Sequence, residues 1–306
     1  MPAAAPGAMP PTALPAPHAL SVAEAEALAT RAMVAAGAPP FVAAPLAASL
    51  AAAERDGCHS HGLHRLPQIT AIMRRGRVAL HARPVVTTPR SGVVCVDGGG
   101  NLLAPALDAA FPAVAAAARA NGVAVASVAG WRGIGGTLWQ PAERLAVNEG
   151  LVCLLAANTP PYVAPHGGRE RLLGTNPFAF GCPGAPCDDG AEAEPQPAFV
   201  FDFATAACAR GEIEVRRRAG TPLDSGWAVD SSGAPTRAPA AALDGAQLPF
   251  GGHKGSAVCA MIELLGGALL GTDLAIDCQP GDALEDMRRG LTIIAIDPAA
   301  TTDCGR

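Results

Sequence analysis

The stretch that says most about this chain reads Glu54-Arg55-Asp56-Gly57-Cys58-His59-Ser60-His61-Gly62-Leu63-His64-Arg65-Leu66-Pro67. Three of the 7 histidines fall between His59 and His64, with a serine among them and an arginine directly after. If Ser60 caps a short helix, His61 and Arg65 are four residues apart and share one face of it. One side chain can then donate a proton while the other binds a carboxylate. The stretch therefore predicts acid–base chemistry on a small organic acid.

Three other interpretations of this stretch stay open. His59, His61 and His64 could bind a metal, but no His-x-x-x-His pair and no nearby acidic third ligand accompany them. They could also be ordinary surface and N-cap residues of a helix. A serine hydrolase is a poorer match, because adjacent Ser60 and His61 side chains diverge by about a third of a turn on a helix. The Gly-x-Ser-x-Gly elbow of such enzymes is missing from the sequence.

Composition narrows the class of protein. The chain has 306 residues, a net charge of -5, 50% hydrophobic residues and 16% charged residues. This length suits one large or two moderate domains with a real core. The composition excludes a disordered chain, and the mild acidity argues against a nucleic-acid partner.

Targeting signals are not evident. The first twenty residues are rich in Pro and Ala and contain no Lys or Arg, which predicts a floppy tail over 1–17 rather than a secretory signal. The longest apolar run, Ala257–Gly271, contains Glu263 and is too short to span a bilayer. The 9 cysteines are an odd number and form no metal-type pairs. We therefore expect a cytoplasmic protein with reduced thiols and no membrane partner.

Periodicity predicts a helical N-terminal part followed by mixed strands and helices, an α+β fold. A capping box, Ser21 with Glu24, opens the first helix. The expected helices cover 22–36, 43–54, 60–74, 105–121, 141–149, 204–217 and a long apolar stretch after the glycine loop at 248–256. The expected strands cover 84–88, 93–96, 123–128, 151–157, 175–182, 198–203 and 291–296, with an acidic loop at 184–197. We predict a helical, substrate-side domain at 18–122, a cofactor domain at 123–298 and a short tail at 299–306.

Two glycine-rich loops are candidate cofactor sites. Gly130-Trp131-Arg132-Gly133-Ile134-Gly135-Gly136-Thr137 lies between a predicted strand and a predicted helix, where backbone N–H groups can meet a phosphate. Phe250-Gly251-Gly252-His253-Lys254-Gly255-Ser256 precedes a helix and holds the only lysine among 22 basic residues. An ammonium group does a different job from an arginine fork, so Lys254 is a candidate ligand for a phosphate. Plain turns and caps remain the alternative for both loops.

A carboxylate ends one apolar strand. Asp202 lies in Val200-Phe201-Asp202-Phe203-Ala204-Thr205 and needs a partner if it is buried. It could cap the next helix, or it could orient a histidine.

Five separate motifs together resemble the type-2 malate/L-lactate dehydrogenase family, from about residue 20 to 298. In chain order they are His59-Ser60-His61-Gly62-x-x-Arg65, Ala164-Pro165-His166-Gly167-Gly168, Gly174-Thr175-Asn176-Pro177, Phe201-Asp202-Phe203-Ala204-Thr205 and Pro249-Phe250-Gly251-Gly252-His253-Lys254-Gly255. The resemblance implies an NAD(P)-binding mixed sheet that is not a Rossmann fold, a homodimer and no metal. Within the family the chain is most similar to reductases of cyclic imino acids.

The resemblance also implies roles for individual residues. His61 is the expected proton donor, with Ser60 and Asp202 as its charge-relay partners. Arg65 is the expected carboxylate clamp, and Thr175 the expected substrate contact. The expected cofactor contacts, with His253 and Lys254 added from the second glycine loop, are Gly133, Ile134, Gly135, Gly136, Thr137, His253 and Lys254.

The function expected from the resemblance is NADPH-dependent reduction of Δ1-piperideine-2-carboxylate and Δ1-pyrroline-2-carboxylate, with NADH as a possible cofactor. The alternative within the family is a dehydrogenase of malate, lactate or ureidoglycolate. Two departures from the family are visible: Ala129–Gly135 replaces an Asn-Ser-His-His-Phe-Gly segment, and relatives continue for some tens of residues after Pro298. A third alternative is therefore a shortened, weakly active homologue.

Overall fold

The structure is a computed structural model that describes residues 19–184, 197–278 and 286–302. The predicted tail at 1–17, the acidic loop between Gly184 and Pro197 and the last residues of the predicted C-terminal tail lie outside these residues.

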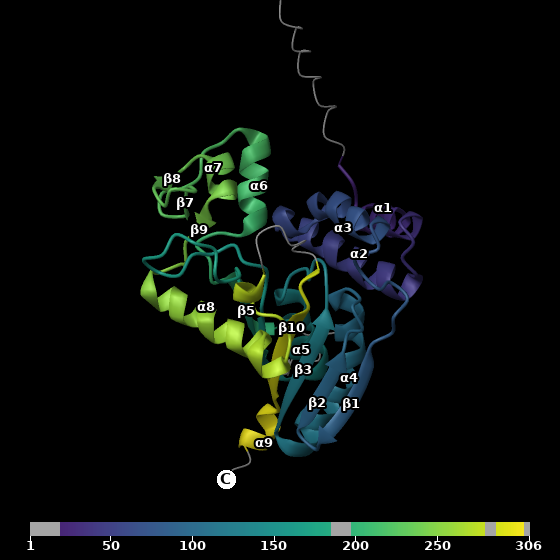
Figure 1. Cartoon of the computed structure of the whole chain (residues 1–306). Helices are drawn as coiled ribbons and strands as arrows, with labels where there is room; N and C mark the ends of the chain where they lie inside the picture. The colour runs from purple at the N-terminus through teal and green to yellow at the C-terminus, as the bar shows by residue number, and fades with distance from the viewer. Residues whose placement is uncertain (1–18, 185–196, 279–285, 303–306) are drawn as a thin grey trace, which may run out of the picture.

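The N-terminal lobe consists of the helices α1 (Val22–Ala35), α2 (Pro40–Arg55) and α3 (Leu66–Arg74), which lie together at the upper right of Figure 1. The predicted capping box is confirmed, since Ser21 Oγ accepts the Glu24 N–H and Glu24 accepts the Ser21 N–H. Helix α2 starts three residues earlier than predicted, because a proline is favourable at a helix start and Pro40 takes that position. The lobe encloses its own apolar core of Met33, Leu46, Ile69 and their neighbours.

A seven-stranded mixed sheet forms the centre of the molecule, in the order β1-β2-β3-β10-β4-β5-β6. Only β2 and β3 pair in parallel among these strands, so the sheet is not the doubly wound parallel sheet of a Rossmann fold. The predicted α+β class is confirmed. The strands are β1 (Val85–Arg90), β2 (Val93–Asp97), β3 (Val123–Trp131), β4 (Val152–Ala157), β5 (Pro177–Pro183), β6 (Pro197–Ala204) and β10 (Arg289–Ile296).

Helices cover both faces of this sheet. Alternate residues of β10 show the arrangement, because successive side chains of a strand point to opposite faces. Leu291 and Ile293 join the core formed with α4 (Leu103–Asn121) and α5 (Trp139–Glu149). Between them, Thr292 Oγ1 donates to the Leu265 carbonyl of α8 (His253–Gly266) on the other face.

A small third lobe lies opposite the N-terminal helices, at the upper left of Figure 1. It contains α6 (Arg210–Ala219), α7 (Pro239–Asp244) and the short strands β7 (Ala228–Val229), β8 (Pro235–Thr236) and β9 (Ala246–Gln247). The remaining short elements are η3 (Ala268–Leu270), η4 (Ala275–Asp277) and α9 (Pro298–Thr302). The helix predicted over 204–217 is wrong at its start, since Ala204 is the last residue of β6.

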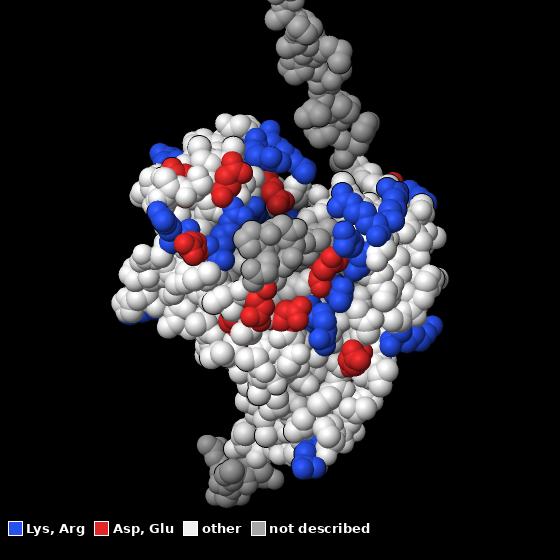
Figure 2. All heavy atoms as spheres, viewed as in Figure 1, with Lys and Arg blue, Asp and Glu red and all other residues white. Residues whose placement is uncertain are grey.

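The domain boundary predicted between residues 122 and 123 separates β2 from β3, which pair in one sheet. The division into domains therefore stays a prediction, and the predicted boundary runs through the central sheet. Figure 2 shows that the charged side chains of this face gather around the junction of the upper lobes, while the lower part of the sheet is nearly uncharged. No described helix is long and apolar enough to cross a bilayer.

Candidate active site

A cavity of about 680 Å³ opens where the N-terminal lobe, the central sheet and the small lobe meet. Side chains from distant parts of the sequence line it together. Among the residues predicted for the site, it gathers Ser60, His61, Arg65, Gly133, Ile134, Gly135, Gly136, Thr137, Thr175 and Asp202. His253 and Lys254 do not line it. The cavity is therefore the candidate active site.

The histidine-rich stretch is not the helix that its spacing predicted. Two 3-10 turns, His59–His61 and Leu63–Arg65, precede α3, which begins only at Leu66. Gly62 interrupts the helical path with φ -89° and ψ -147°. Glu54, at the end of α2, secures this path, because it accepts the Leu63 N–H at 2.7 Å and lies 2.6 Å from His59 Nδ1. The stretch is thus a tight loop that the Glu54 carboxylate holds in place.

The tight turn brings Ser60 and His61 into contact. Ser60 Oγ lies 3.1 Å from His61 Nδ1, and Cys58 Sγ lies 3.7 Å from the same nitrogen. The divergence expected from helical spacing is therefore wrong. Since a hydroxyl and a thiol can both donate to Nδ1, the proton of a neutral imidazole belongs on Nε2.

His61 is neutral at pH 7 in the free protein. Burial lowers its pKa to about 4, and the neighbouring Arg65 and His64 side chains add to the effect. The other histidines of the stretch have separate partners: His59 pairs with Glu54, and His64 lies 3.7 Å from Glu214. Across the described residues, no group of three or more His, Cys, Asp or Glu side chains is arranged to hold a metal ion.

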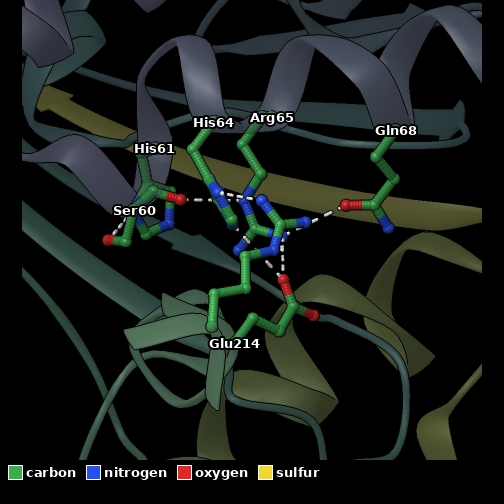
Figure 3. Close-up of polar contacts among 7 residues, drawn as sticks. Ser60, His61, His64, Arg65, Gln68 and Glu214 are labelled. Carbon is green, nitrogen blue, oxygen red and sulfur yellow. Dashed lines mark hydrogen bonds and ion pairs between the residues drawn. The ribbon is translucent and has the colours of Figure 1, made fainter. Parts of the chain in front are cut away.

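Arg65 is already partly engaged, as Figure 3 shows. Its Nε donates to the Ser60 carbonyl at 2.8 Å, and its Nη1 donates to Gln68 Oε1 at 3.1 Å and to Glu214 Oε2 at 3.2 Å. Glu214 lies on α6 in the small lobe, so this ion pair joins two lobes across the cavity. The Arg65 side chain is only 12% exposed, which strengthens the pair relative to a surface one.

Asp202 caps a helix, but not the one that follows it in the sequence. Its Oδ2 accepts the N–H groups of Leu138 at 2.7 Å and Trp139 at 3.1 Å, at the start of α5. Burial raises its pKa, and these two hydrogen bonds oppose the rise. Among the described residues, the Asp202 carboxylate accepts these two hydrogen bonds from α5, and its relay to His61 stays a prediction.

The loop Gly133–Thr137 connects β3 to α5 and forms one wall of the cavity. A side chain at Gly135 would meet the Trp131 ring at 2.9 Å, so the loop must pass close to that ring without one. Thr137 Oγ1 is buried and has no hydrogen-bond partner among the described residues. Such a hydroxyl costs free energy unless a ligand satisfies it, and a polar cofactor group can do so. The loop therefore fits a cofactor.

Thr175 is fixed by a network behind the cavity wall. Its Oγ1 lies 3.1 Å from Thr159 Oγ1, and its N–H donates to the same oxygen at 2.7 Å. The adjacent Asn176 adopts φ 35°, an unusual value for a residue with a side chain. The buried Glu263 supports it by accepting from Asn176 Nδ2 at 2.6 Å.

His253 and Lys254 are the first residues of α8 and are exposed. The His253 ring lies 6.0 Å from the His166 ring, centroid to centroid. Phe250, from the same glycine loop, does line the cavity. The loop thus reaches the cavity through Phe250, while His253 and Lys254 do not line it.

Sequence reasoning missed Arg210, which also lines the cavity. The helix predicted over 204–217 placed it inside a helix, whereas it is the first residue of α6. The nearby Arg171 donates to the carbonyl oxygens of Leu243 and Gly245. In the sequence, the position of Arg210 could have been noticed only from Gly211, because a glycine next to it permits close packing against the cavity.

Comparisons with known proteins agree with this geometry. The malate/L-lactate dehydrogenase family matches residues 20–305. The chain is 42% identical over 288 residues to a Δ1-pyrroline-2-carboxylate reductase of Ancylobacter novellus, which covers 92% of this chain and 80% of that protein. It is 42% identical over 255 residues to a Δ1-pyrroline-2-carboxylate/Δ1-piperideine-2-carboxylate reductase of Pseudomonas aeruginosa, covering 83% and 73% of the two.

A solved structure shares the fold over most of the chain. The Δ1-piperideine-2-carboxylate reductase of Pseudomonas syringae superimposes with a TM-score of 0.82 at 38% identity, covering 92% of this chain and 82% of that one. The resemblance that five motifs predicted is confirmed. The chain belongs to the malate/L-lactate dehydrogenase family and is an oxidoreductase.

Proposed function

We propose that this protein reduces the cyclic imino acids Δ1-piperideine-2-carboxylate and Δ1-pyrroline-2-carboxylate to L-pipecolate and L-proline with NADPH. The observation that carries the proposal is the pairing of His61 with Arg65 in one cavity, which suits a ring nitrogen beside a carboxylate. The names of two relatives, each 42% identical to this chain over most of its length, support the same substrate class.

The reaction places one hydride on the C=N carbon and one proton on the nitrogen. NADPH supplies the hydride when it is bound. Arg65 holds the substrate carboxylate and so fixes the position of the imine carbon. His61 faces the imine nitrogen through Nε2, while Ser60 and Cys58 hold its Nδ1.

The low pKa of free His61 is compatible with this role. A bound carboxylate puts a negative charge beside the imidazole and raises its pKa, because an opposite charge favours the protonated form. The site therefore takes up the proton when the substrate binds, either on the imine nitrogen or on His61. It holds this proton only in the complex of protein and substrate. In this proposal Asp202, which is held at the start of α5, is the charge-relay partner of His61.

The cofactor is assigned to the wall formed by Gly133, Ile134, Gly135, Gly136 and Thr137. The unsatisfied Thr137 hydroxyl and the backbone of the loop are the donors that support this assignment. His253 and Lys254, at the positive end of the α8 dipole, are proposed to bind a cofactor phosphate outside the wall. We propose that this phosphate is the ribose 2′-phosphate, which NADPH has and NADH lacks, so NADPH is the favoured cofactor and NADH the weaker alternative.

We also propose a cytoplasmic homodimer. An apolar face extends outward from the cavity: Phe203 and Phe250 line the cavity, are 40% and 37% exposed, and their rings lie 5.6 Å apart. Phe199 continues this face along β6 and is 58% exposed. A second copy seated here would exclude water from the cavity entrance, as a hydride transfer requires. The seven described cysteines are all free thiols, in keeping with a reducing compartment.

The function is tested by following NADPH oxidation with Δ1-piperideine-2-carboxylate and identifying the product. The proposal predicts consumption of one NADPH for each L-pipecolate formed. Absence of pipecolate at millimolar substrate would reject it. Sedimentation of the active protein tests the dimer, and a fully active monomer would contradict it.

A further inference from the structure

Arg210 combines a half-buried cation with an unused, buried hydrogen-bond donor. Its Nη1 is buried and has no partner among the described residues. Its Nη2 makes one long hydrogen bond, 3.3 Å to the Leu243 carbonyl. Its guanidinium carbon lies 4.7 Å from the centre of the Tyr162 ring, which holds the group in place by a cation–π contact. A buried charge with a free donor is costly unless a ligand completes it.

The neighbouring Arg65 is in the opposite state. Its Nε and Nη1 already donate to a carbonyl oxygen, to Gln68 and to Glu214. A substrate carboxylate therefore meets one arginine that is partly neutralised by Glu214 and one that keeps a free donor. Both side chains line the same cavity.

We propose that Arg210 is a second carboxylate-binding residue of this cavity, which acts with Arg65 on the single carboxylate of the substrate. The inference rests on the proposed function and names a further residue for it. Arg210 Nη1 adds a further N–H donor beside the partly engaged fork of Arg65.

The local charge balance sets the number of carboxylates that the site accepts. The charged side chains that line the cavity are three arginines, Arg65, Arg210 and Arg289, and two carboxylates, Asp202 and Glu214, so one positive charge is left for the ligand. A monocarboxylate neutralises the group. A dicarboxylate such as oxaloacetate would bring a further negative charge that these arginines do not balance, and such a charge is unfavourable in a half-buried site.

The backbone around Arg210 is built for this position. Gly211 lets α6 pack directly onto the loop below, since a Cβ there would lie 2.9 Å from the Ser60 carbonyl oxygen and 3.1 Å from Arg65 Cζ. Ala209, the N-cap of α6, makes no side-chain hydrogen bond to the helix. The positive end of the α6 dipole therefore adds to the field of Arg210, although Glu212 in the first turn, which pairs with Arg216, offsets part of it.

The test compares Arg210→Met with Arg217→Met on the exposed side of the same helix. Arg210→Met keeps an apolar stem over Tyr162 and removes the charge. We expect the KM for the cyclic imino acid to rise about tenfold or more, the KM for NADPH to stay unchanged, and Arg217→Met to behave as wild type. An Arg210→Met enzyme with an unchanged KM for the imino acid overturns the inference.

A binding measurement separates this inference from the proposed function. Calorimetric titration with 2-furoate, a planar ring carboxylate that cannot be reduced as an imine, reports on the carboxylate site without turnover. We expect Arg210→Met to weaken 2-furoate binding about tenfold and Glu214→Gln to tighten it, since these changes remove charges of opposite sign. If wild type binds 2-furoate through Arg210 but reduces no imino acid, the proposed function fails and the inference stands. Equal affinity in wild type and Arg210→Met overturns the inference whatever the activity.

Folding is controlled in the same experiment. Arg210→Lys keeps the charge and loses the planar fork, so its KM is expected between those of wild type and Arg210→Met. If Arg210→Met unfolds, the inference is tested by the KM of Arg210→Lys, which must exceed that of wild type. A lysine variant that unfolds like the wild type and binds 2-furoate equally well would contradict a role for the fork.

Discussion

Acid should destabilise this protein through His61. The imidazole has a folded pKa of about 4, against about 6.5 in an unfolded chain. Between these values the unfolded chain binds a proton that the folded protein does not. Stability is therefore fully present above pH 6.5, falls as the pH drops toward 4, and levels off below that.

The size of the effect follows from the two pKa values. Linkage gives a loss of about 2.5 kcal/mol from His61 alone when the pH falls from 7.5 to 4.5. The substitution His61→Gln removes this contribution and leaves all other titrating groups in place. The loss of stability over this pH interval should thus be about 2.5 kcal/mol larger in wild type than in the variant.

Urea unfolding at both pH values, at equal protein concentration, measures this difference. Ser60→Ala serves as the matched control: it keeps the imidazole buried, and burial is the first cause of the shift. The control is expected to lose stability as wild type does. Equal losses in wild type and His61→Gln would refute the reasoning and mean that His61 carries its proton in the free protein near neutral pH.

Other perturbations have distinct signatures. Arg65→Lys should raise the KM for the imino acid about tenfold in steady-state assays and leave the KM for NADPH alone, because a point charge cannot replace a planar fork; an unchanged KM would move the carboxylate site. Gly211→Ala should do the same by pushing a Cβ against Arg65, and full affinity for the imino acid would contradict the packing. Asp202→Asn should cost about 1 kcal/mol in urea unfolding, since it weakens the cap of α5. NADPH should protect Lys254, the only lysine, from amine labelling; indifference to NADPH would make Lys254 structural.

The local signals in the sequence were good guides to the elements near the chain start. The Ser21 capping box placed α1, because a cap depends only on neighbouring residues. The same reasoning failed at Ser60, where Gly62 and the distant carboxylate of Glu54 select two 3-10 turns over a helix. Strands β7, β8 and β9 have two residues each, too few to show any period. Strand order is also not local: β10, the last strand in the chain, lies in the middle of the sheet.

The sequence predicted which residues belong to the candidate site, but not how their side chains are arranged. Family motifs selected Ser60, His61 and Arg65, and the structure places all three on one cavity. The partner of Asp202 could not be predicted, since the helix that it caps starts 63 residues earlier in the chain. Arg210 was missed because its importance comes from an unsatisfied donor, which exists only after folding.

The ratio of kcat/KM values for cyclic imino acids and oxo acids tests the central claim most directly. Δ1-Piperideine-2-carboxylate and Δ1-pyrroline-2-carboxylate are compared with pyruvate and oxaloacetate, at saturating NADPH and one pH. The His61→Ala enzyme is measured in parallel. The account predicts that the imino acids exceed both oxo acids on the order of a hundredfold, and that His61→Ala loses at least a similar factor. A kcat/KM for pyruvate or oxaloacetate equal to or above that of the imino acids would contradict it.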